Sequence, residues 1–193
     1  MTQSTLAALR EATGSAHARL DGSLRLARDP SPADVRLHLQ AMFSFLEPVE
    51  GELWAQPALS HLQPELRARK TRWLRADLER LGALPTPSVP ELSVPELPLR
   101  APAGLGVAYV LEGSMLGGRV LARRPALAGL RFFEGYGEDT GRLWRELVVE
   151  LERATPFSRR IIVDAAVETF GAITEWLEAH GALHERISAE ASA

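Results

Sequence analysis

The chain has 193 residues, a formal net charge of −3, 46% hydrophobic and 24% charged residues, and no cysteine. This length fits one domain with a sizeable core, and the proportions are those of an ordinary globular protein. The small negative charge gives no reason to expect a nucleic acid or an acidic membrane as partner. The lack of cysteine excludes disulfides, thiolate metal sites, cysteine nucleophiles and cysteine-held iron–sulfur clusters. A transition metal would therefore need histidine, a carboxylate or a cofactor.

The N-terminal residues and the hydropathy pattern predict a cytoplasmic protein. The chain opens with polar residues and continues into an amphipathic segment, which is unlike a signal peptide. The sequence has no run of about 18 or more apolar residues, so no membrane span is expected.

The first part of the chain shows helical periodicity. Within residues 4–21, five side chains recur at spacings of three and four and therefore share one helix face. These side chains are Leu6, Leu9, Thr13, His17 and Leu20. Ser31 suits the N-cap of a second helix that starts at Pro32 and runs to about residue 54, with Pro48 as a kink or break. A third, strongly charged helix is predicted over residues 64–81.

A proline-rich segment follows at residues 85–102. It holds six of the 13 prolines, a density that precludes a helix and favours extended or polyproline geometry. We interpret it as a surface connection inside a single domain that covers residues 1–193. A docking strip for a partner is the alternative.

Helical patterns resume after this segment. We expect helices over residues 103–123 and 139–153, with an aromatic loop over residues 127–136 between them. Thr155 and Pro156 suit the N-cap and first position of a last helix, and Gly181 suits its C-cap. The tail from about residue 185 to 193 is expected to fray. Because no segment has a convincing strand pattern, the predicted fold class is all-α.

His17 is the first candidate for chemistry because it lies on the apolar face of the first helix. A histidine among leucines is usually a core residue satisfied by one hydrogen bond. The same placement also suits an axial ligand of haem iron, in which one ring nitrogen binds the metal and a neighbouring group holds the other. Asp21 lies one turn further on and is a candidate for that second contact. The spacing alone leaves both interpretations open.

Three glycines interrupt an apolar helix in the segment Glu112-Gly113-Ser114-Met115-Leu116-Gly117-Gly118-Arg119. Each glycine costs a helix roughly 1 kcal/mol relative to alanine. Gly113 and Gly117 are four residues apart and leave one face bare, which lets a flat ligand approach the backbone closely. Close packing of two helices is the alternative. The segment is not a phosphate-binding loop, because it has no preceding strand and no Gly-Lys-Ser/Thr ending.

Arginines are the candidate contacts for an anionic ligand. Arg10 lies two turns before the candidate histidine on the same side of the first helix, and Arg142 and Arg145 lie in the helix expected over residues 139–153. An arginine grips a carboxylate with paired, charge-assisted hydrogen bonds. Taken singly, each of these arginines is also typical of a solvated surface charge.

The order of these motifs resembles the haem oxygenase family. Leu9-Arg10-Glu11-Ala12-Thr13-Gly14-Ser15-Ala16-His17 looks like the family's first-helix motif, whose histidine is the proximal iron ligand. The segment from Gly113 to Gly118 resembles the glycine-rich distal helix. Tyr109-Val110-Leu111-Glu112-Gly113-Ser114 looks closer to the bacterial branch associated with bacteriophytochromes.

Later segments match the family in kind and order, so the resemblance covers most of the chain except the proline-rich segment and the tail. These segments are Gly129-Leu130-Arg131-Phe132-Phe133, the helix with Trp144, the helix start Thr155-Pro156, and Phe170. The resemblance implies a single-domain helical bundle that holds haem between a proximal helix with His17 and a distal helix with Gly113 and Gly117. The other cofactor contacts that it implies are Arg10, Arg142, Arg145 and Phe170.

For function, the resemblance implies that haem is both cofactor and substrate. The ring would be opened to biliverdin, CO and iron with O₂ and with electrons from a ferredoxin, a flavodoxin or a reductase. Gly113, Ser114 and Gly117 would act on the distal side of the haem. The bacterial branch also implies a bacteriophytochrome as recipient of the product. The net charge and the lack of a long apolar run, given above, predict neither a nucleic acid nor a membrane as partner.

One position departs from many family members. An aspartate usually follows the first distal glycine and orders water in the pocket, whereas this chain has Ser114. A hydroxyl donates and accepts hydrogen bonds but carries no charge. Two alternatives therefore stay open. One is a haem carrier or sensor on the same fold, and the other is a helical enzyme acting on another small molecule, such as a thiamin-related compound.

Overall fold

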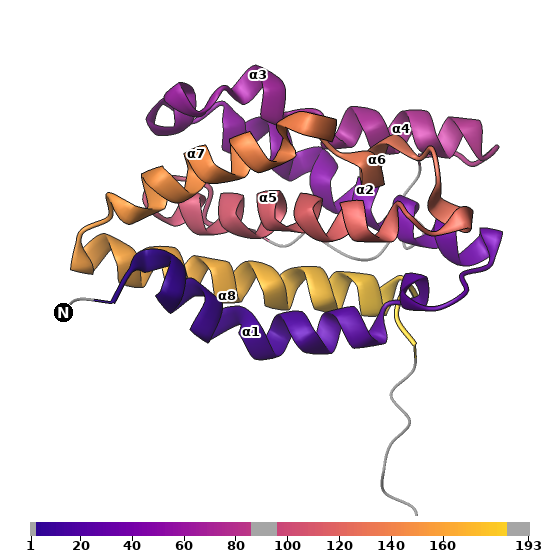
Figure 1. Cartoon of the computed structure of the whole chain (residues 1–193), viewed down its shortest axis with the longest axis horizontal. Helices are drawn as coiled ribbons and strands as arrows, with labels where there is room; N and C mark the ends of the chain where they lie inside the picture. The colour runs from indigo at the N-terminus through magenta and orange to yellow at the C-terminus, as the bar shows by residue number, and fades with distance from the viewer. Residues whose placement is uncertain (1–2, 86–95, 185–193) are drawn as a thin grey trace, which may run out of the picture.

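The computed structural model describes residues 3–85 and 96–184, and within these residues the protein is all-α, as predicted (Figure 1). The described residues contain no β-strand, and their β-type pairing is one isolated bridge between Leu24 and Leu183. Most of the proline-rich segment and the whole predicted tail lie outside the described residues. Each helix in the described part is too short or too polar to cross a bilayer.

The described elements follow one another as α-helices and short 3-10 helices, the latter labelled η. In chain order they are α1 (Thr5–Ser23), η1 (Arg25–Ala27), α2 (Pro32–Trp54), η2 (Pro57–Leu62), α3 (Pro64–Arg67), α4 (Lys70–Arg80), α5 (Ala103–Leu121), η3 (Pro125–Leu127), α6 (Arg131–Glu134), η4 (Gly137–Asp139), α7 (Thr140–Glu152) and α8 (Pro156–Ala179).

Local caps fix the start of two long helices. Ser31 and Asp34 form a capping box at α2, in which each side chain accepts a hydrogen bond from the other residue's backbone N–H. At α8 the Thr155 side chain accepts from the N–H of Ser158. Both N-caps are confirmed. α2 continues through Pro48 to its end, so this proline does not break the helix.

The single helix predicted over residues 64–81 is wrong, because the structure divides it into α3 and α4. α4 begins at Lys70, where the Glu50 carboxylate accepts hydrogen bonds from the backbone N–H groups of Lys70 at 2.8 Å and Thr71 at 2.9 Å. The first N–H groups of a helix need such acceptors. Here the acceptor belongs to α2, so the local sequence pattern does not reveal where the helix restarts.

The aromatic segment predicted as a loop over residues 127–136 is also different, because it contains α6. The Asp77 carboxylate of α4 accepts hydrogen bonds from the backbone N–H groups of Arg131 at 2.9 Å and Phe132 at 2.8 Å. Burial raises the pKa of Asp77, against the lowering effect of these two bonds. This cap is again distant in sequence from the helix that it starts.

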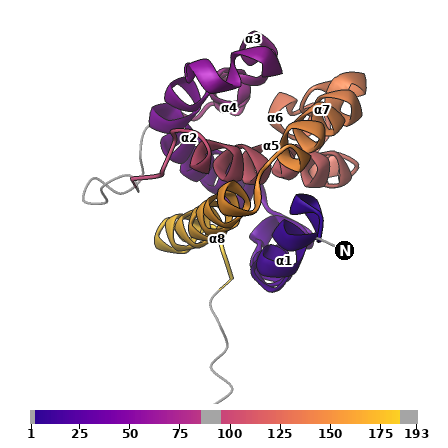
Figure 2. The ribbon, with the colours of Figure 1, turned by 90° about the vertical axis from the view of Figure 1, so that its left-hand side faces the viewer.

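α5 occupies the centre of the bundle, as the end-on view in Figure 2 shows. α8 packs along α5, and α1 lies beside α8 (Figure 1). α6 and α7 also contact α5, while α2 packs mainly against α4 and also against α8. The central helix therefore packs against α6, α7 and α8.

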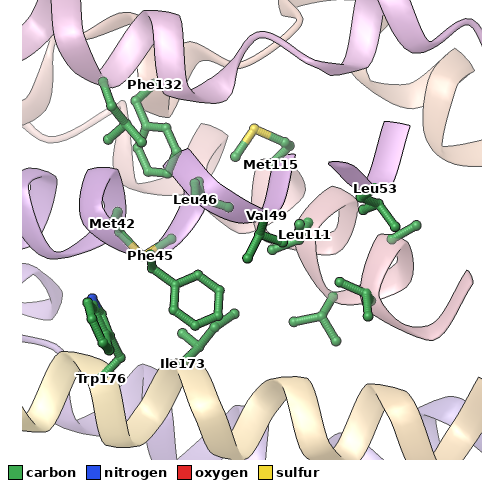
Figure 3. Close-up of a cluster of buried hydrophobic side chains, with 14 of the residues drawn as sticks. Met42, Phe45, Leu46, Val49, Leu53, Leu111, Met115, Phe132, Ile173 and Trp176 are labelled. Carbon is green, nitrogen blue, oxygen red and sulfur yellow. The ribbon is translucent and has the colours of Figure 1, made fainter. Parts of the chain in front are cut away.

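The apolar core lies where α2, α5 and α8 meet, and Figure 3 shows side chains of all three helices pointing toward one another. Phe45 of α2, Leu111 of α5 and Ile173 of α8 are representative members. Trp176 of α8 adds a polar link, since its indole N–H donates to the carbonyl of Ala41 at 2.9 Å. α1 takes little part in this core, because its buried residues are limited to Thr5, Leu9 and Thr13.

Candidate functional site

A cavity of about 850 Å³ lies between α1 and α5, with α8 along its base. This volume is in the range of small-molecule and cofactor sites. Six of the eight predicted site residues line it, and these are Arg10, His17, Gly113, Ser114, Gly117 and Phe170. The cavity explains why α1 buries so few side chains, because much of its inward face meets open space rather than the core.

His17 projects from α1 into this cavity, and its side chain is 56% exposed. The interpretation of His17 as a core residue is therefore wrong. Its Nδ1 lies 3.0 Å from a carboxylate oxygen of Asp21, one helical turn further on. Its ring meets the Phe170 ring edge to face, with the centroids 5.8 Å apart. When Nδ1–H donates to Asp21, Nε2 keeps its lone pair and can bind a metal ion.

The glycines of α5 keep the opposite wall of the cavity flat. A Cβ added at Gly117 would meet nothing within 4 Å, and one at Gly113 would only touch the Trp144 ring at 3.7 Å. Gly14 of α1 is equally open, with nothing within 4 Å of an added Cβ. Close helix–helix packing does not explain Gly117 or Gly14, because no neighbour fills the space of their missing side chains. Both walls thus leave room for a flat group.

Ser114 also lines the cavity, and its hydroxyl is held by its own helix. The Ser114 Oγ donates to the carbonyl of Leu111 at 2.7 Å. With its single hydrogen used in this way, the hydroxyl offers acceptor lone pairs to the cavity.

A buried ion network supports α5 at the residue next to Gly113. The Glu112 carboxylate accepts from Arg67 at 2.8 Å and from the Lys70 ammonium at 2.7 Å, and the Tyr136 hydroxyl adds a third bond at 2.9 Å. Arg67 and Lys70 are completely buried. Burial alone would lower the pKa of Lys70, but the charge of Glu112 and its other partners raise it above its ordinary value. The Lys70 ammonium therefore keeps its charge at physiological pH.

The three predicted arginines differ in position. Arg10 lines the cavity near the N-terminal end of α1, whereas Arg142 and Arg145 of α7 are not among its lining residues. Arg142 is paired with Glu146 at 2.7 Å and with Asp139 at 3.0 Å, and these hydrogen bonds raise its pKa. The pairing matches the interpretation of Arg142 as a surface charge.

Two residues that the sequence did not single out also line the cavity. Arg124 follows α5, and its guanidinium donates to the carbonyl of Arg28 at 3.2 Å. His38 of α2 is buried, and its ring stacks on Phe133 with the centroids 6.0 Å apart. The periodicity of α2 places His38 one turn before the buried Met42, which was the available sign that it faces inward.

The described residues contain no group of three or more histidines and carboxylates arranged to hold a metal ion. A metal bound at His17 would therefore take most of its ligands from a cofactor. His180 and His184 do not form a metal site either. His180 is buried, and its ring contacts Trp176 rather than His184.

One comparison with known proteins gives a partial match. A curated protein of Xanthomonas campestris pv. campestris (strain 8004) named heme oxygenase is 40% identical over 91 residues, which are 44% of this chain and 52% of that protein. The chain thus spans about half the length of this curated relative. No protein-family model matches the chain.

Proposed function

We propose that the protein is a haem oxygenase that binds haem iron through His17 and opens the ring to biliverdin, CO and iron. The observation that carries this proposal is the hydrogen-bonding arrangement of the His17 imidazole in the cavity. Asp21 engages Nδ1 at 3.0 Å, which leaves Nε2 available to a metal opposite a glycine-faced helix. The partial similarity to a protein named heme oxygenase supports the same function.

The cavity fits a flat, metal-bearing group. Gly14 on α1 and Gly117 on α5 leave space that ordinary side chains would fill. The Phe170 ring stands beside the imidazole of His17 and offers an apolar contact for the same group. A thiolate ligand is excluded because the chain has no cysteine, and a neutral histidine ligand suits chemistry at a haem edge.

Each residue has a separate task in this proposal. Asp21 holds the imidazole in one tautomer and orientation. Gly113 and Gly117 let the α5 backbone approach the ligand, and Ser114 contributes an acceptor for water in the cavity. When bound, haem supplies both the iron that activates O₂ and the carbon that is oxidised.

The propionates of haem would meet arginines. Arg10 is the best placed, because it lines the cavity and is exposed. Arg142 and Arg145 of α7 are the further candidates, although neither lines the cavity. A propionate would have to replace Glu146 and Asp139 as the partner of Arg142.

The electrons would come from outside the chain, from a ferredoxin, a flavodoxin or a reductase. The segment from Tyr109 to Ser114 further favours the phytochrome-associated bacterial type, with a bacteriophytochrome as recipient of biliverdin. These two partners belong to the proposal and follow from the family resemblance.

Turnover of haemin tests the proposal. Haemin is added to the protein with ascorbate or a ferredoxin system under air, and the products are separated by chromatography. The proposal predicts biliverdin in stoichiometric amounts. A tightly bound haem whose spectrum persists without biliverdin would instead indicate a carrier, a function that the engaged hydroxyl of Ser114 favours. Failure to bind haem stoichiometrically would overturn both.

A further inference from the structure

A second hollow lies in the groove between α1 and α8, which are neighbours along the bundle (Figure 1, Figure 2). We call it the α1–α8 groove. Its volume is about 570 Å³, which is in the range of small-molecule sites. At one end the chain that follows α8 crosses α1, where the backbone N–H of His184 donates to the carbonyl of Ser23 at 2.8 Å. The proposed function makes no use of this groove.

The walls of the α1–α8 groove leave room for a ligand with an apolar part. Gly22 on α1 and Gly171 on α8 line it, and a Cβ added to either would meet nothing within 4 Å. Leu20, Phe170 and Leu183 are its larger apolar side chains. Leu20 and Phe170 also line the main cavity, so they form the wall between the two hollows. The ring of Phe170 suits contact with another aromatic ring.

Two opposite charges without partners line the same groove. Arg19 belongs to α1 and Glu175 to α8, and both are exposed. Within the described residues, neither side chain forms an ion pair or a hydrogen bond. Glu178 lines the groove as well, but it already takes part in an interaction of its own. Because a guanidinium suits a carboxylate and a carboxylate suits an ammonium, the free pair favours a ligand that carries both charges.

Two hydroxyl groups of the groove also favour an ammonium. The Thr174 hydroxyl donates to the carbonyl of Phe170 at 2.7 Å, and the Ser23 hydroxyl donates to the carbonyl of Leu20 at 3.0 Å. With its hydrogen used in this way, each hydroxyl offers acceptor lone pairs to the groove. An ammonium has three donors and no acceptor, so it matches these lone pairs together with the neighbouring carboxylate of Glu175.

We propose that the α1–α8 groove binds a small zwitterion with an apolar side chain, the chemistry of a free aromatic amino acid. Arg19 would bind the carboxylate, and Glu175 with Thr174 would bind the ammonium. Phe170 and Leu183 would contact the apolar side chain. A ligand with one charge would leave either the guanidinium or the carboxylate of the groove unpaired. The proposal goes beyond haem oxygenase activity and does not depend on it.

Three fluorinated probes test the groove in the full-length protein without haem. 4-Fluorophenylalanine carries both charges, 3-(4-fluorophenyl)propionate lacks the ammonium, and 2-(4-fluorophenyl)ethylamine lacks the carboxylate. ¹⁹F NMR titration at low ionic strength gives the affinity of each. The wild-type protein should bind the zwitterion about fivefold more tightly than either single-charge probe. This factor corresponds to about 1 kcal/mol, the upper range for an exposed ion pair.

Each charge of the groove has its own variant. Glu175→Gln should remove the advantage of the zwitterion over the propionate but keep its advantage over the amine. Arg19→Gln should have the converse effect. Glu168→Gln and Arg160→Gln are the matched controls, because both side chains are exposed on α8 and lie outside the groove, and they should keep both advantages.

Gly171→Leu tests the place of binding, because it fills the groove at a position where an added side chain meets no neighbour. It should abolish binding of the zwitterion, and circular dichroism checks that the variant is folded. Equal affinities of the three probes in the wild-type protein, no binding of any, unchanged affinity in Gly171→Leu, or loss of both advantages in each charge variant would overturn the proposal.

The main cavity is a second place where an aromatic probe could bind, and zinc protoporphyrin distinguishes the two. This diamagnetic, flat ligand should not displace the zwitterion from the groove, and displacement would overturn the proposal. Because the three-probe titration contains no haem, its failure leaves the haemin turnover result untouched, and the converse also holds.

Discussion

On one side of α5, Glu112 is enclosed by the charged groups of Arg67 and Lys70, whereas on the cavity side Gly113 and Gly117 face open space. Glu112 lies one residue before Gly113 and five residues before Gly117 on the same helix. On the buried side, the Glu112 carboxylate is paired with both cations at 2.7–2.8 Å. On the cavity side, a Cβ added at Gly117 would meet no atom within 4 Å.

The difference indicates that one side of α5 stabilises the fold and the other side is shaped for a ligand. A helix that carries several glycines loses stability relative to one with alanine at these positions. The ion network and the core around Leu111 offset this loss, because they stabilise α5 on the side that faces away from the cavity. They do so without placing side chains in the cavity. Substitutions behind α5 should therefore change stability most, and substitutions in front should change ligand binding most.

The largest effect is expected from Lys70→Met. It removes the cation that is paired with the buried carboxylates of Glu112 at 2.7 Å and Glu50 at 3.7 Å. Breaking a buried pair from one side costs about 3–5 kcal/mol, because an uncompensated charge remains. Urea denaturation of both proteins measures the change in the free energy of unfolding. Arg153→Met is the control, since Arg153 is exposed and its pair with the half-buried Glu150 should contribute about 1 kcal/mol or less. Equal losses in the two variants would contradict the comparison.

The next effect concerns His38 and is a dependence on pH. Its folded-state pKa of about 4 lies below the ordinary value of 6.5, so the unfolded chain binds a proton first as the pH falls. The neutral form then stabilises the folded state fully above pH 6.5, and this contribution is lost as the pH falls toward 4. The loss should amount to about 3 kcal/mol.

Denaturation at pH 7 and at pH 4, for the wild-type protein and for His38→Leu, measures this contribution. The wild-type protein should lose more stability than the variant by about that amount. A parallel loss in both proteins would show that His38 is not responsible.

A smaller effect of opposite sign is expected on the cavity side. Gly117→Ala should raise the free energy of unfolding by about 0.5–1 kcal/mol, because alanine favours the helix and the added Cβ meets no neighbour within 4 Å. The same variant should bind haemin more weakly, since the methyl group enters the space proposed for the ligand. Thermal denaturation and haemin titration measure the two effects separately. A loss of stability would show that the site is packed after all.

The sequence predicts the parts of this structure that depend on neighbours along the chain. The N-caps at Ser31 and Thr155 and the shared face of His17 and Arg10 follow from local spacing. The start of α4 does not, because its cap is the carboxylate of Glu50, twenty residues earlier on another helix.

The candidate site shows the same limit. Arg142 lies four residues before Glu146, a spacing that favours an ion pair on the helix surface, and the structure has that pair. Nothing in the sequence shows that His38 lacks a hydrogen-bond partner, because this depends on Phe133 and the other residues around it in space. A pattern along the chain places a side chain on a face, and the tertiary structure determines what that face meets.

The most direct measurement for the central claim is a haemin titration of the wild-type protein and His17→Ala, followed by visible absorption. The wild-type protein should give a stoichiometric, histidine-ligated spectrum, and the variant should lose it and regain it when imidazole is added. His61→Ala is the control, because His61 pairs with Glu150 on the surface, and it should behave as the wild-type protein. An unchanged haem spectrum in His17→Ala would contradict the account.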